Sequence, residues 1–131
     1  MEKEFVLYGL ALELKQLGFD EPCFKYIYMG DTGNNVNISC EVVPSSAKNY
    51  NEVDVCVSTP TYSQSFRWFR EKHELFHSII YQDDNSGPSV FDYEILSKRG
   101  KSQIDESTEF DTHEEAELAC LKKLIEIVKT K

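Results

Sequence analysis

The stretch of residues 59–77, TPTYSQSFRWFREKHELFH, constrains the fold most. It predicts a helix rich in aromatic side chains that must be buried against other elements. One helical face carries residues spaced at i, i+4, i+7 and i+11, which are Tyr62, Phe66, Phe69 and His73. Trp68 and Leu75 fall on a different face. Thr59 is a preferred N-cap residue and Pro60 suits the first helical position, so we predict that the helix starts there. Large aromatic residues mostly serve packing, so a helix with two apolar faces is expected between other elements.

The segments on either side predict hairpins and two further helices. Leucines recur at helical spacing over residues 7–17, and Gly18 fits the left-handed position after a helix. A final helix is predicted from the capping box of Thr112 and Glu115 to Lys129, with apolar residues on one broad face: Leu118, Leu121, Leu124, Ile125 and Val128. Strands are expected at residues 23–29, 36–42, 53–57, 78–82 and 90–96, with a short one at 102–104.

The order of elements is therefore α-β-β-β-α-β-β-(β)-α. Hairpins between helices favour an α+β fold in which helices pack on an antiparallel sheet, rather than a wound parallel sheet. With 131 residues, the chain is expected to form one compact domain over residues 1–131.

The central stretch ends in His73-Glu74-Leu75-Phe76-His77, which matches the HExxH pattern of zinc hydrolases. Two histidines one helical turn apart can bind Zn²⁺, and the glutamate between them can act as general base toward a metal-bound water. Candidates for a third ligand are Asp83, Asp84, Glu94 and His113. However, the strand-like residues after His77 predict that the helix ends near Leu75, which would remove His77 from the helical face of His73.

Composition limits the function classes. The formal net charge of −9 argues against general nucleic-acid binding, which needs cations to neutralise phosphates, but suits docking onto a basic partner. We expect no membrane span, because no apolar run approaches the required length of about 20 residues. The charged start of the chain lacks a signal peptide, so we expect a cytoplasmic protein. The cysteines have no CxxC spacing and are expected to be free thiols: Cys23, Cys40, Cys56 and Cys120.

Three segments resemble a family of short, uncharacterised proteins of gut and environmental bacteria and their phages. They are LGFDEPCF at residues 17–24, TPTYSQSFRWFREKHEL at 59–75 and FDTHEEAELACLKKLIEIVK at 110–129. The resemblance implies a phage or prophage accessory protein. Members of the family often carry Tyr where His73 stands here, which implies that the HExxH string is incidental.

We therefore expect a non-enzymatic module, without a cofactor, that binds a host or phage protein and inhibits a host defence system. Because Trp and Arg often anchor interfaces, the predicted binding residues are Arg67, Trp68 and Arg70. One alternative is a zinc hydrolase that uses His73, Glu74 and His77. A second is a small-ligand-binding protein with an aromatic pocket of Phe24, Tyr26, Tyr28 and Trp68.

Overall fold

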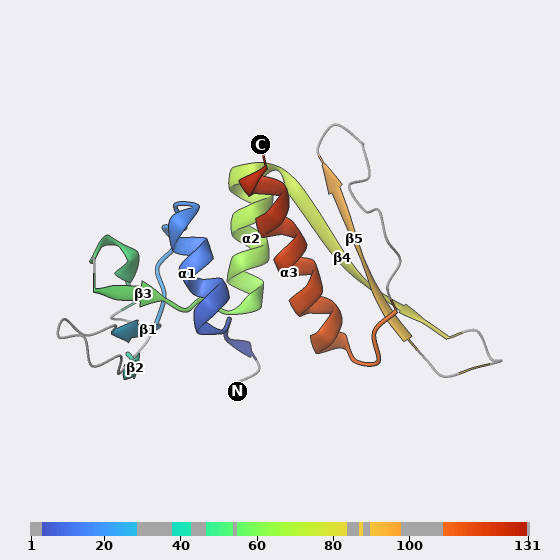
Figure 1. Cartoon of the computed structure of the whole chain (residues 1–131), viewed down its shortest axis with the longest axis horizontal. Coiled ribbons are helices and arrows are strands. Elements are labelled where there is room, and N and C mark those ends of the chain that lie inside the picture. The colour runs from blue at the N-terminus through green and yellow to red at the C-terminus, as the bar shows by residue number, and fades with distance from the viewer. Residues whose placement is uncertain are drawn as a thin grey trace. The chain divides into compact units, whose positions relative to one another are not determined.

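The computed structural model describes residues 4–28, 38–42, 47–53, 55–83, 87, 90–97 and 109–130, and its α+β architecture confirms the predicted fold class (Figure 1). The order of helices and strands agrees with the prediction, but the strands form two antiparallel sheets. The chain divides into two compact units, residues 1–65 and 66–131, and each is described by itself. The expectation of one domain over residues 1–131 remains a prediction.

The first unit begins with helix α1 (Tyr8–Gln16), whose end follows the sequence signal closely. Gly18 has φ +95°, its N–H donates to the Lys15 carbonyl, and the Phe19 N–H donates to the Leu14 carbonyl. This pair of bonds is the Schellman motif, and the buried side chains of Phe19 and Leu14 add the apolar contact that accompanies it. Leu7 does not continue the buried stripe as expected, because it is the N-cap residue and is 65% exposed.

A three-stranded sheet of order β2-β1-β3 completes this unit. Strand β1 (Lys25–Tyr28) pairs with β2 (Ile38–Glu41) and β3 (Cys56–Ser58), and a 3₁₀ helix, η3 (Tyr50–Glu52), precedes β3. The third strand therefore begins three residues later than predicted. The side chain of Asn51 explains this, since its Oδ1 accepts from Ser58 N–H at 2.8 Å and its Nδ2 donates to the Phe19 carbonyl at 3.0 Å. The segment before β3 is thus held as a turn.

Helix α2 (Tyr62–His73) starts two residues later than Thr59 and Pro60 predicted. The Thr59 N–H donates to the Lys25 carbonyl and the Pro60 carbonyl accepts from Val6 N–H, so both residues still belong to extended pairing. Thr61 and Gln64 cap the helix instead. Thr61 Oγ1 accepts from Gln64 N–H at 3.1 Å, and Gln64 Oε1 accepts from Thr61 N–H at 3.0 Å. Each side chain satisfies the other's backbone donor, which is a complete capping box.

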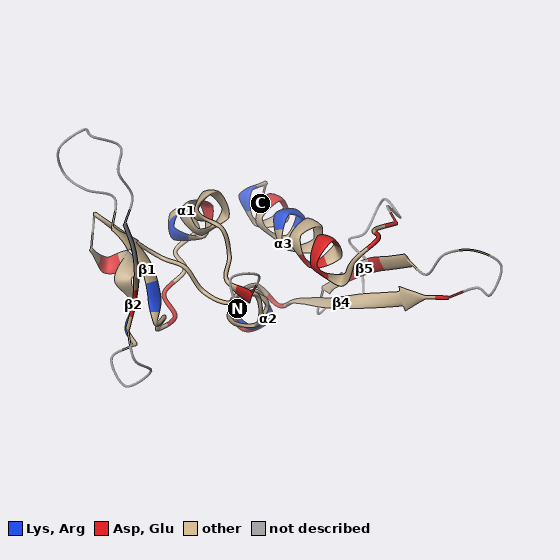
Figure 2. Ribbon diagram, turned by 90° about the horizontal axis from the view of Figure 1, so that it is seen from below, with Lys and Arg blue, Asp and Glu red and all other residues tan. Residues whose placement is uncertain are grey.

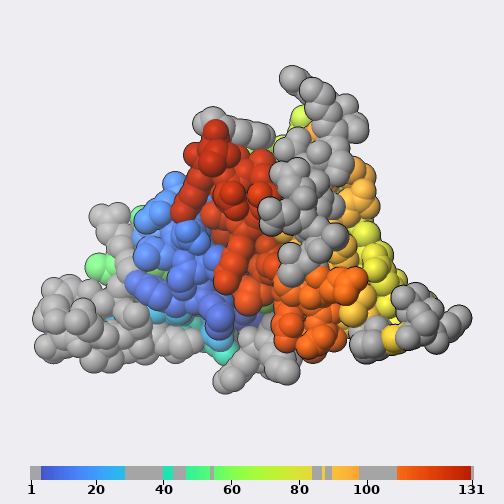
Figure 3. All heavy atoms as spheres, turned by 45° about the vertical axis from the view of Figure 1, so that its right-hand side comes forward, coloured from blue at the N-terminus to red at the C-terminus, as the bar shows by residue number. Residues whose placement is uncertain are grey.

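The second unit contains an antiparallel hairpin covered by a helix. Strands β4 (Leu75–Gln82) and β5 (Val90–Ser97) pair in register from Leu75↔Ser97 to Gln82↔Val90. Helix α3 (His113–Lys129) packs on both strands (Figures 1 and 3). Its buried side chains are Ala116, Cys120, Leu121, Leu124 and Ile125, whereas the predicted core residues Leu118 and Val128 are half-buried.

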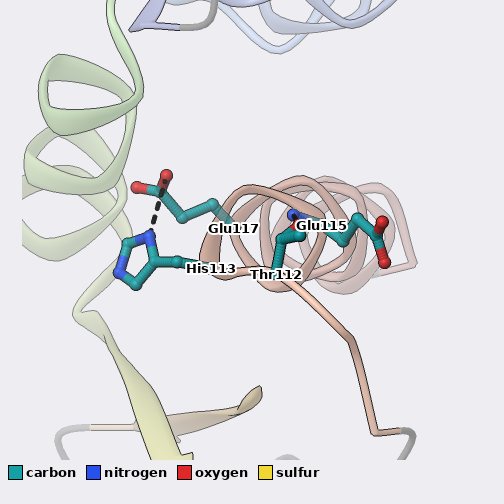
Figure 4. A network of polar contacts seen from close by, with 4 residues as sticks. All are labelled: Thr112, His113, Glu115 and Glu117. Atoms are coloured by element: carbon teal, nitrogen blue, oxygen red, sulfur yellow. Dashed lines mark hydrogen bonds and ion pairs between the residues drawn. The ribbon is translucent and has the colours of Figure 1, made fainter. Parts of the chain in front are cut away.

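The cap of α3 forms only half of the predicted box. Thr112 Oγ1 accepts from Glu115 N–H at 3.1 Å, whereas the Glu115 carboxylate points away from Thr112 (Figure 4). The short strand predicted at residues 102–104 lies outside the described residues. Among the described residues, no helix has the length and apolar character needed to cross a membrane.

Candidate functional site

The HELFH string is divided between a helix and a strand. His73 is the last residue of α2, and β4 begins at Leu75. Glu74 alone joins them, with φ +56°, in the left-handed region that few non-glycine residues adopt. His73 and His77 therefore do not lie one turn apart on a helical face, which is the arrangement that gives the zinc motif its chemistry. The helix ends even earlier than the sequence predicted.

His77 lies in a defined setting of its own. Its imidazole stacks on the Phe66 ring, with centroids 3.7 Å apart and planes inclined by 12°. Burial lowers the pKa of His77, and the positive charges of Arg70 and His113 lower it further. The arrangement favours the neutral form of His77, and His113 meets the ring of Phe91, which lies on the same face of the hairpin as His77.

His113 forms a second polar pair with Glu117 on the first turns of α3. His113 Nδ1 lies 3.3 Å from Glu117 Oε1, at i, i+4 spacing, and the two side chains face each other (Figure 4). Burial raises the pKa of Glu117, although the adjacent His113 acts in the opposite direction. The edge of the Phe91 ring meets the His113 ring at 5.8 Å. The pair thus links the first turns of α3 beside the Phe91 ring.

The candidate metal ligands from the sequence do not assemble into one group. Of these, His113 interacts electrostatically with His77, whereas Asp83 follows the end of β4 and Glu94 lies on the opposite face of the hairpin. Asp84 is outside the described residues. Within the described part of the chain, no three His, Cys, Asp or Glu side chains are placed so that they could hold a metal ion.

The three predicted binding residues separate into one buried and two exposed side chains. Trp68 is only 3% exposed, with its ring edge-on to Phe69 at 5.1 Å and to His73 at 4.8 Å. The Trp68 ring is thus buried beside its neighbours on α2, and its role in binding stays a prediction. Arg67 and Arg70 are exposed.

The aromatic residues proposed to line a small-ligand pocket are divided between the two units, and this alternative stays a prediction. Tyr26 stacks on Tyr50, with centroids 4.0 Å apart and planes inclined by 17°, so one face of its ring is already covered. Phe24 meets Phe5 edge-on at 5.7 Å. Phe24, Tyr26 and Tyr28 belong to the first unit, whereas Trp68 belongs to the second.

An exposed apolar pair on the hairpin was not found from the sequence. Phe76 and Leu96 are register partners in β4 and β5, and they are 40% and 38% exposed. They lie on the outer face, opposite α3, because the alternate residues Tyr81 and Phe91 form the face that reaches His113. Both strands reach the molecular surface, yellow and orange in Figure 3. The strand predicted at residues 78–82 does not include Phe76, so the pair could not be found until β4 was seen to begin at Leu75.

The four cysteines are free, as predicted, and Cys23, Cys56 and Cys120 are buried. Burial raises the pKa of Cys23 and of Cys120 to about 12 in each case, so these thiols have little nucleophilic character. Comparison of the chain with protein-family models, curated proteins and solved structures finds no match. The candidate sites therefore rest on geometry alone.

Proposed function

We propose that the chain is a non-enzymatic protein-binding module that contacts its partner through the outer face of the β4–β5 hairpin. The observation that carries this proposal is the exposed cross-strand pair of Phe76 and Leu96. Two large apolar side chains side by side on an open sheet face lose contact with water when a partner covers them. Burial of such surface is the main favourable term in protein association.

The surroundings of the pair support a protein partner. Ile80 and Val90 lie on the same face and are half-buried, while Asp92 and Glu94 bring two carboxylates to it. On β5 these two acidic residues stand between Val90 and Leu96, so the face combines apolar and acidic side chains, which suits a partner that presents both apolar and basic residues. The net charge of −9 further favours a partner with a basic surface.

Arg67 and Arg70, which are exposed on α2, remain proposed binding residues outside this face. The resemblance of the sequence to proteins of bacteria and their phages supports a partner in a bacterial host or its phage. We propose that the module acts there as an accessory protein that inhibits a host defence system. This function requires no cofactor.

The test is retention of host proteins by the tagged full chain in bacterial cells, with Phe76→Ser and Leu96→Ser as variants. Leu7→Ser is the matched control, because Leu7 is a similarly exposed apolar residue in the first unit. A stoichiometric partner should be retained by the unmodified chain and by the control, and reduced by about tenfold or more in both hairpin variants. Equal retention by all four proteins would exclude this face as the binding surface.

A further inference from the structure

The outward edge of β4 presents unpaired backbone groups. Phe91 exchanges both backbone hydrogen bonds with Phe110, at 2.8 Å each, so its N–H and C=O point away from β4. Its register partner on β4 is Tyr81, which makes Tyr81↔Phe91 a non-hydrogen-bonded pair of the hairpin. By the alternation of an antiparallel ladder, the N–H and C=O groups of His77 and Ile79 point to the outer edge of β4, whereas Leu75 at the start of the strand is buried. Among the described residues, these groups have no backbone partner on that side.

This edge lacks the features that normally prevent strands from pairing with other chains. The β4 sequence LFHSIIYQ contains no Asp, Glu, Lys, Arg or Pro, and its ribbon carries neither acidic nor basic colour along its length (Figure 2). The β5 sequence VFDYEILS carries Asp92 and Glu94, and its edge is partly covered by the bridge to Phe110. Natural edge strands are usually protected by charge, Pro or cover, so an uncharged edge in a chain of net charge −9 indicates a place of contact.

We propose that two copies of the chain pair through β4, forming a continuous four-stranded antiparallel sheet with a two-fold axis through Ser78. His77 of one copy lies opposite Ile79 of the other, and these residues exchange backbone hydrogen bonds on both sides of the axis. On the outer face, Phe76 lies opposite Ile80 of the second copy. Both α3 helices cover the same face of the joined sheet, which gives the usual two-layer arrangement of an α+β domain.

The register follows from matching side chains. A two-fold axis perpendicular to the sheet keeps each face intact, so odd residues of β4 oppose odd residues and even residues oppose even ones. With the axis at Ser78, Leu75 opposes Tyr81 and Phe76 opposes Ile80, so apolar residues meet apolar residues. With the axis one residue later, at Ile79, Phe76 opposes Gln82 and Leu75 opposes Asp83. The first register is therefore the favoured one.

The occupant of the edge is a second copy because β4 suits an identical strand. Two chains that each carry a net charge of −9 repel each other wherever their charged faces meet. Contact through β4 brings no formally charged side chain of one copy opposite a like charge of the other. Toward its C-terminal end, β4 also diverges from α2 (Figure 1).

The test uses Ser78, which is exposed and lies on the proposed axis. Ser78→Lys and Ser78→Glu each place two like charges directly opposite one another, whereas an equimolar mixture of the two variants places Lys opposite Glu. Gln16→Lys, on the exposed end of α1, adds the same charge away from the edge. The readout is mass by light scattering or sedimentation between about 1 µM and about 500 µM chain.

The unmodified chain and Gln16→Lys should reach twice the chain mass of 15.1 kDa. Each Ser78 variant alone should raise the dissociation constant by about tenfold or more, and the mixture should restore dimers. A monomer throughout this range, an open series of larger species, or failure of the mixture to restore dimers would overturn the proposal. The dimer uses the backbone edge of β4, whereas partner binding uses the outer face with Phe76. A chain that is monomeric but still retains its partner through Phe76 would therefore overturn the dimer and leave the proposed function intact.

Discussion

The imidazole of His77 lies flat against the ring of Phe66, with the ring centroids 3.7 Å apart and the planes inclined by 12°. The stack joins β4 to α2 just beyond the single residue that connects them. A neutral ring packs in this position at no electrostatic cost, whereas an imidazolium would lose hydration and face the charge of Arg70. His77, the second histidine of the HExxH string, is thus part of the packing of the second unit.

The lowered pKa of His77 predicts a specific loss of stability in acid. Below the ordinary pKa of 6.5, the unfolded chain binds a proton at His77 that the folded chain does not, so the free energy of unfolding falls with falling pH. This decrease in the free energy of unfolding ends once the pH is below the pKa of His77 in the folded chain. Phe in place of His77 keeps an aromatic ring against Phe66 and removes the titration.

We therefore expect His77→Phe to lose less stability than the unmodified chain between about pH 7.5 and about pH 5.5. Urea unfolding at a series of pH values measures this difference. Parallel pH profiles for the two proteins would show that His77 is not the group responsible.

Glu74 offers a substitution that separates a structural role from a catalytic one. Its φ of +56° is a strained value for a residue with a Cβ, and Gly adopts it freely. Glu74→Gly is therefore expected to stabilise the fold by about 0.5 to 1 kcal/mol. Glu71→Gly, in the exposed helical part of α2, should destabilise it by about 1 kcal/mol.

Thermal unfolding of the two variants measures the contrast. A loss of stability in Glu74→Gly as large as that in Glu71→Gly would contradict the backbone argument. Under the zinc-hydrolase alternative, Glu74 would be the general base, and the purified chain would hold stoichiometric zinc that His73→Ala removes. Elemental analysis of the unmodified chain and of His73→Ala measures the zinc content independently of stability.

The N-cap of α1 is unoptimised and should accept an improvement. Leu7 has the extended backbone of an N-cap residue, with φ −70° and ψ 159°, but offers no side-chain hydrogen bond to the first turn. Because Leu7 is 65% exposed, little packing is lost on its removal. Leu7→Ser should raise the free energy of unfolding by about 0.5 to 1 kcal/mol, measured by urea unfolding. Leu7→Ala removes the same apolar surface without adding a hydroxyl, and an equal gain there would disprove the capping explanation.

Thiol chemistry should distinguish the cysteines in the folded chain. Burial raises the pKa of Cys23 and Cys120 to about 12, which leaves almost no thiolate at neutral pH. Cys40 is only half-buried in β2. Iodoacetamide followed by mass mapping should modify Cys40 first, and Cys23 and Cys120 only after denaturation. Early modification of Cys120 would mean that α3 opens readily from the hairpin.

Local signals in the sequence predicted the elements that depend on local physics. Gly18 ended α1 because the left-handed position after a helix favours Gly, and Thr112 opened α3 because its hydroxyl caps the first turn. The strand alternation that predicted β5 is likewise a property of the segment itself.

The misplaced features depend on contacts between distant segments. Thr59 and Pro60 carry the residue types of a helix start, yet pairing with Lys25 and Val6 keeps them extended. Nothing in the sequence marks Glu74 as a left-handed residue, so the end of α2 and the start of β4 were misplaced. Trp68 was proposed as a binding residue although its exposure could not be predicted, because periodicity identifies a helical face but not what covers it.

The direct junction of α2 and β4 has a consequence for how this chain can change in evolution. A helix repeats about every 3.6 residues and a strand every two, and only Glu74 separates the two periods here. One inserted or deleted residue within β4 would turn its following side chains to the opposite face, carrying Tyr81 away from α3 and Ile80 toward it. The segment from Phe66 to Gln82 can therefore accept many substitutions of side chain, but its length is fixed by geometry.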